Sequence, residues 1–65
     1  MKTIQEITDR YTVMDSVKER IVSELKKLSD ADKVEYAQQE GMHYRYSQMI
    51  PSGQMAMDLI NHSNI

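Results

Sequence analysis

Apolar residues between Ile4 and Leu28 recur at spacings that alternate between three and four positions. The stripe consists of Ile4, Ile7, Tyr11, Met14, Ile21, Leu25 and Leu28, and Lys18 is the position that interrupts it. This spacing places the apolar side chains on one side of a helix. The stretch is therefore expected to be helical and to supply about half of a small core.

Two capping signals divide the stretch. Thr3 and Glu6 match a capping box, in which each side chain satisfies a free backbone amide at a helix start. Ser16 and Glu19 match a second box, and Asp15 is another good N-cap. The box at Ser16 and the cap at Asp15 would both be unused inside one helix from residue 4 to residue 28. We therefore favour a short helix followed by a longer one, with the join near Asp15.

Lys18 has two interpretations. In the first, the helix breaks near residue 15 and a new stripe begins, formed by Val17, Ile21, Leu25 and Leu28. In the second, Lys18 is the polar position of a coiled-coil-like seam, where a single polar residue sets register and oligomeric state. The first interpretation is favoured.

Further helices are expected in the second half. Ser29 is a good N-cap for a helix from about Asp30 to Met49, whose stripe is Val34, Ala37, Gly41 and Tyr44. Pro51 ends that helix, and residues 51–53 are expected to form a turn.

Ser52 can cap a last helix from Gly53 to about Asn61. Its apolar face is Met55, Ala56, Leu59 and Ile60, and residues 61–65 are expected to fray.

Length sets the fold class. The chain has 65 residues and no cysteine, so it makes one domain, residues 1–65, without disulfides. The pattern predicts an all-α fold, a bundle of three to four short helices. A core this small is marginal by itself, and small domains commonly gain stability by association. A homodimer is therefore expected.

Charge and hydropathy narrow the class of function. Eight Lys and Arg stand against ten Asp and Glu, so the basic excess typical of nucleic-acid binders is missing. No apolar run approaches the roughly 18 residues that span a bilayer, and no signal peptide is recognised. The expected location is the cytoplasm, without membrane association.

Catalytic motifs are not found. The chain has no cysteine nucleophile, and its two glycines, Gly41 and Gly53, form no phosphate-binding loop. We therefore expect a protein that is not an enzyme and needs no cofactor.

Protein–protein interaction is the favoured function. Tyr and Arg are common interface anchors, and Met suits adaptable binding surfaces. The expected partner-binding residues are Tyr44, Arg45, Tyr46, Met49, Met55 and Met57. Small helical domains without catalytic motifs are common among phage and plasmid accessory proteins and bacterial regulators. The sequence thus favours a cytoplasmic accessory or regulatory protein that binds another protein, itself, or both.

Two alternatives from other classes stay open. Lys18, Arg20, Lys26 and Lys27 could contact nucleic acid through its phosphates. Glu40 and His43, three positions apart on a helix, could contribute to a carboxylate–histidine metal site shared by a dimer. Short motifs of this kind occur often by chance, and the site would need carboxylates from a facing helix.

The order of elements is similar to that of the Hha family of small bacterial nucleoid-associated modulators. The similar stretch runs from Met14 to Asp30, about a quarter of the chain. The resemblance implies an all-helical regulator that acts by binding another protein. The chain departs from the family in the aromatic and charged pattern of the third helix and in an early Ile50–Pro51 step.

Overall fold

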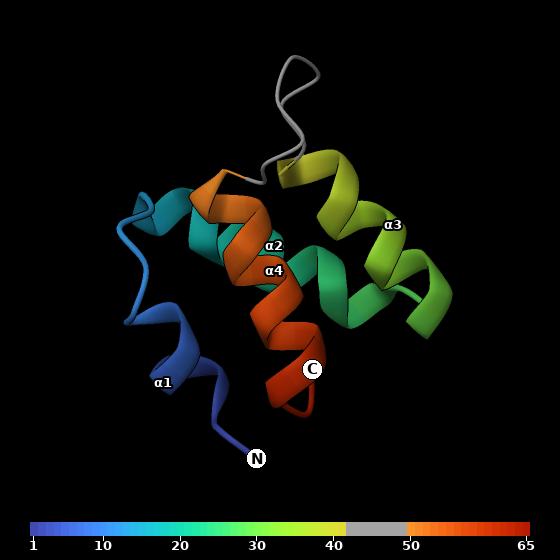
Figure 1. Cartoon of the computed structure of the whole chain (residues 1–65), viewed down its shortest axis with the longest axis horizontal. Helices are drawn as coiled ribbons and strands as arrows, with labels where there is room; N and C mark the ends of the chain where they lie inside the picture. The colour runs from blue at the N-terminus through green and yellow to red at the C-terminus, as the bar shows by residue number, and fades with distance from the viewer. Residues whose placement is uncertain (42–49) are drawn as a thin grey trace.

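Four helices form the part of the chain that the computed structural model describes, residues 1–41 and 50–65. They are α1 (Ile4–Thr8), α2 (Asp15–Lys27), α3 (Asp30–Gly41) and α4 (Pro51–His62). No strand occurs within these two ranges. The expected all-helical fold is confirmed, and Figure 1 shows α4 between the other elements.

The predicted break in the first apolar stretch is confirmed. α1 begins with the expected capping box, since the Glu6 amide donates to the Thr3 hydroxyl (3.1 Å) and the Thr3 amide donates to the Glu6 carboxylate (3.2 Å). The second predicted box is wrong. α2 begins at Asp15 with Met14 as its N-cap and no side-chain cap, so Ser16 lies inside the first turn. Asp15 still places a negative charge at the positive end of the helix dipole.

The boundary between α2 and α3 lies where the sequence predicts it, at Ser29. The Asp32 amide donates to the Ser29 hydroxyl (3.3 Å), as expected for an N-cap. α3 is described to Gly41, which is buried, and its expected continuation to Met49 lies outside the described residues. The Gly41 carbonyl accepts a hydrogen bond from the Ile50 amide (2.7 Å), which joins the end of α3 to the start of α4.

α4 begins earlier than the sequence predicts. Residues 51–53 are not a turn. Pro51 is the first helical residue, and Ile50, with extended backbone, is the N-cap in place of Ser52. The first position of a helix needs no amide donor, so proline is well suited to it, and proline also keeps the preceding residue extended.

The core collects around α4, which packs against each of the other three helices and most extensively against α3. Its fully buried apolar side chains among the described residues are Ile7, Ile21, Leu25, Ala37, Met55, Ala56 and Leu59. The predicted inward face of α4 is confirmed. Met14 departs from the predicted stripe and is 72% exposed, at the N-cap position of α2 where its backbone is not helical.

The end of the described chain does not fray as predicted. The Ser63 hydroxyl is buried and donates to the Leu59 carbonyl (2.6 Å). The Lys2 amide donates to the His62 carbonyl (2.9 Å), and the Lys33 ammonium donates to the Ile65 backbone oxygen (3.0 Å). The bonds from Lys2 and Lys33 come from residues far away in the sequence, so local composition does not reveal them.

Two tyrosines occupy contrasting environments. The Tyr11 hydroxyl donates to the Asp58 carboxylate (2.8 Å) and so fastens the segment after α1 to α4. The Tyr36 hydroxyl is buried and has no hydrogen-bond partner among the described residues. Burial raises the pKa of both phenols, and the bond to Asp58 raises the pKa of Tyr11 further.

Removing these hydroxyls one at a time should have different effects on stability. Tyr11→Phe loses a hydrogen bond and is expected to lower the free energy of unfolding by about 0.5–1.5 kcal/mol. Tyr36→Phe removes an unpaired buried hydroxyl and is expected to be neutral or stabilising. Urea unfolding followed by circular dichroism measures both variants. Equal losses in the two variants would contradict the assignment of partners.

Alkaline pH should weaken the fold through the same groups. A phenol whose pKa is raised by folding contributes stability fully below its unfolded pKa, about 10, and loses that contribution as pH rises through the folded value. Thermal unfolding temperatures measured between pH 8 and pH 11 are expected to fall above pH 10. Tyr11→Phe should make this fall shallower, and an unchanged slope would contradict the expectation.

Candidate functional site

The predicted partner-binding residues divide into two groups. Tyr44, Arg45, Tyr46 and Met49 lie outside the described residues, as does His43. Met55 is fully buried in the core, and Met57 is half-buried and packs against it. The Met55 side chain is therefore not available to a partner in this fold. Its spacing of four from Leu59 is the sequence signal for a core position.

A bidentate salt bridge between Arg20 and Glu40 links α2 to α3. The guanidinium donates to both carboxylate oxygens, at 2.7 Å and 3.4 Å. The hydrogen bond and charge of Glu40 raise the pKa of Arg20. Glu40, the first residue of the predicted metal motif, is thus already engaged. Within residues 1–41 and 50–65, no three His, Asp or Glu side chains come close enough to hold a metal ion.

The four basic residues of the nucleic-acid alternative do not share one face of α2. At about 100° per residue, Lys18 and Lys26 lie on one side of the helix, and Arg20 and Lys27 lie on the other. Arg20 pairs with Glu40, and Lys27 pairs with Glu24 at 3.7 Å. The structure therefore divides this group into two pairs of residues.

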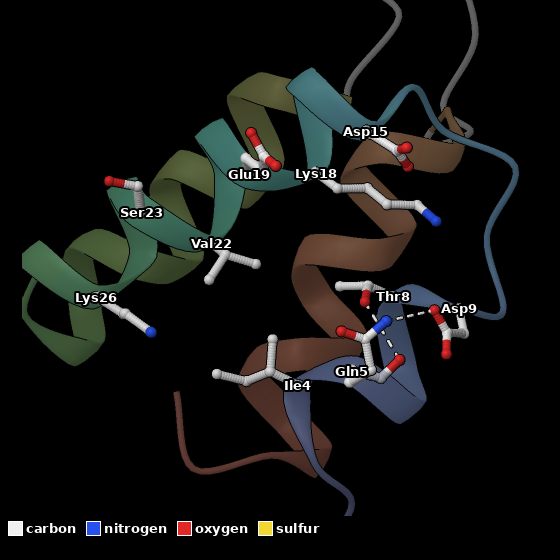
Figure 2. A pocket seen from close by; sticks show the side chains of 10 residues that line it. All are labelled: Ile4, Gln5, Thr8, Asp9, Asp15, Lys18, Glu19, Val22, Ser23 and Lys26. Atoms are coloured by element: carbon white, nitrogen blue, oxygen red, sulfur yellow. Dashed lines mark hydrogen bonds between the residues drawn. The ribbon is translucent and has the colours of Figure 1, made fainter.

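Lys18 and Lys26 lie on a groove of about 500 Å³ between α1 and α2, which we call the α1–α2 groove. Its lining residues are Ile4, Gln5, Thr8, Asp9, Asp15, Lys18, Glu19, Val22, Ser23 and Lys26. The groove exists because α1 and α2 both pack against α4 and make no extensive contact with each other. Figure 2 shows the ribbon of α4 passing behind the two walls.

The middle of the groove is apolar. The side chains of Ile4 and Val22 point toward the space between the walls (Figure 2). Both are partly buried and pack against the core, so they extend it toward the surface. An occupant that covered them would remove further apolar area from water, at about 25 cal/mol per Å².

The α1 wall satisfies its own polar groups. The Gln5 amide donates to the Asp9 carboxylate (2.7 Å), and the Thr8 hydroxyl donates to the Gln5 carbonyl (3.3 Å). Thr8 is also buried, so its hydroxyl is neither free nor accessible as a nucleophile. No histidine lines this wall or the opposite one in the part of the chain that the structure describes.

The α2 wall presents charges at both ends. Asp15 and Lys18 lie at one end of the groove, near Asp9, and Lys26 lies at the other end (Figure 2). Unlike Arg20 and Lys27, the groove lysines have no ion-pair partner within 4 Å among the described residues. The arrangement, apolar in the middle and charged at its ends, suits the binding of another chain.

Sequence reasoning did not identify this groove. Its signal was present in the polar interruption at Lys18, which shares the groove wall with Asp15, Val22 and Lys26 at spacings of three, four and four. What the sequence could not supply was the position of α1, which depends on its packing against α4.

No helix within residues 1–41 and 50–65 is long and apolar enough to cross a membrane. Comparison of the chain with models of protein families, with curated proteins and with solved structures finds no match. The local similarity to the Hha family therefore has no support beyond the stretch that suggested it.

Proposed function

We propose that this chain is a small cytoplasmic accessory or regulatory protein that acts by protein–protein interaction through helix faces. Its contact surface is the α1–α2 groove. The observation that carries the proposal is the combination of Ile4 and Val22 in the middle of the groove with charges at its ends that form no ion pair within 4 Å among the described residues.

The shape of the groove favours a helical partner. Two helices form its walls, and the row of Lys18, Val22 and Lys26 follows the axis of α2 at intervals of one turn. A helix that lies in such a groove presents apolar side chains at the same intervals. Its own charged side chains can form ion pairs with the charges at the ends of the groove. Recognition of this kind needs no reacting group.

The size of the core gives a second argument. Seven apolar side chains among the described residues are fully buried. Domains below about 70–80 residues rarely gain more than about 3–5 kcal/mol from a single core, and association is one of the usual ways to add to it. An occupant covering Ile4 and Val22 would extend the core across the interface. Nucleic acid and metal receive no comparable support from the described residues.

Placing a charge in the middle of the groove should abolish binding. Val22→Glu buries a carboxylate wherever a partner covers the groove, so we expect at least a tenfold loss of co-purifying partner. The tagged chain would be isolated from cells that encode it, and the captured proteins, including untagged copies of the chain, would be quantified. Gln38→Glu, at an exposed position on α3, is the matched control.

Circular dichroism of each variant shows whether the fold is retained, and Val22→Thr supplies a milder polar change at the same position. Identical capture by the original chain, Val22→Glu and Gln38→Glu would overturn the proposed surface. A loss in both Val22→Glu and Gln38→Glu would do so too, because charge alone would then explain it.

A further inference from the structure

We infer that the occupant of the α1–α2 groove is helix α2 of a second copy of this chain, lying antiparallel to its counterpart. The two-fold axis passes between the two helices at the level between residues 20 and 21, so that Asp15 of each subunit faces Lys26 of the partner subunit. This inference rests on the proposed function, because it names the partner that the groove accepts.

The groove face of α2 has the geometry that such pairing needs. Asp15 and Lys26 are eleven residues apart, which is about 1,100° of helix rotation, only about 20° more than three full turns. Val22 lies within about 20° of Asp15 by the same reckoning. All three residues therefore point to one side of the helix, and all three line the groove. The two charges are separated by about 16 Å along the axis.

The order of the charges is self-complementary. Asp15 lies in the first turn of α2 and Lys26 lies in the last. When an identical helix runs in the opposite direction, each acidic end meets a basic end, and two symmetric ion pairs form. Two-fold interfaces have this property, because each contact occurs twice with the roles exchanged. The antiparallel helix dipoles are also arranged favourably.

The α1 wall reinforces this match. Asp9 lies at the same end of the groove as Asp15, so this end carries two carboxylates against the single ammonium of Lys18. Its net negative charge attracts Lys26 of the partner subunit. In this register Glu19 lies opposite Val22 of the partner subunit, about 6 Å along the axis from the position opposite Lys18 of the partner subunit.

Val22 and Glu19 lie nearest the centre of the interface among the groove-lining residues of α2. Val22 lies one and a half residues from the axis, so the two copies are offset by about 4–5 Å along the helix. With helix axes about 9 Å apart, their Cα atoms approach to about 6 Å. Each Val22 thus covers the other, and the pair adds to the apolar area that the seven core side chains bury.

The charges on the opposite face of α2 are already used within the subunit. Arg20 pairs with Glu40, and Lys27 pairs with Glu24. On the groove face, by contrast, Lys26 has no ion-pair partner within 4 Å among the described residues of its own subunit. A second copy supplies Asp15 to Lys26 without requiring any other protein, and this argues for self-association.

Charge exchange tests the register. Sedimentation equilibrium should give twice the chain mass of 7.6 kDa for the original protein. Asp15→Lys and Lys26→Glu should each raise the dissociation constant roughly tenfold to a hundredfold, since each converts two attractions per dimer into repulsions. The double variant should recover the original constant. A mixture of the two single variants should form a heterodimer, because both of its cross-subunit pairs are attractive.

Matched controls separate the interface from effects on the helix itself. Asp32→Lys also removes an acidic residue from the first turn of a helix, α3, and Lys27→Glu also removes a basic residue from the last turn of α2. Neither residue lines the groove, and both controls are expected to leave the dissociation constant unchanged.

Cross-linking provides an independent readout. The chain has no cysteine, so Val22→Cys introduces a single thiol close to the axis. A Cα separation of about 6 Å is within the range of disulfides, and mild oxidation should give a covalent dimer. Lys27→Cys, on the opposite face, should stay monomeric under denaturing conditions.

A monomeric mass at about 100 µM, or charge variants that dimerise as well as the original chain, would overturn the inference. Loss of a captured foreign protein in Val22→Glu from a monomeric chain would overturn self-association and leave the proposed function standing. Capture of no chain of any kind would remove both.

Discussion

Burial of the apolar face of α4 is the constraint on which the rest of the structure depends. Met55, Ala56 and Leu59 are fully buried, and α4 is the helix against which each of the other three packs. α1 has only five residues, too few to be stable alone, so it is helical here because Ile7 packs into this core. Close packing of α3 on α4 is allowed by small residues, with Ala37 and Ala56 both fully buried.

The α1–α2 groove results from this packing of the helices around α4. Because α1 and α2 are both attached to a third helix, they need not touch each other, and the surface between them keeps Ile4 and Val22 within reach of solvent. The walls then differ in character. The α1 wall pairs its own polar groups, whereas the charges of the α2 wall form no ion pair within 4 Å among the described residues. A groove that exposes two apolar side chains between such charges is suited to association.

Local signals in the sequence were sufficient wherever a helix boundary is set by its own residues. The capping box at Thr3, the cap at Ser29 and the inward face of α4 could all be predicted for this reason. Prediction was wrong where two local solutions compete, as at Ser16 and Pro51, or where distant residues intervene, as at the hydrogen-bonded tail. The groove could not be predicted, since it depends on the placement of α1 by residues more than forty positions away.

The bonds that tie α1 and its flanking residues to α4 also bear on how the chain folds. The hydrogen bond from Tyr11 to Asp58 spans 47 positions, and the one from Lys2 to His62 closes nearly the whole chain. α3 and α4, in contrast, are successive helices and share the largest interface. Contacts between neighbouring elements require less loop closure, so the α3–α4 pair is expected to assemble early and α1 to dock late. The groove is then complete only at the last step of folding. Its five-residue wall, α1, is expected to be the first helix to detach when the protein unfolds.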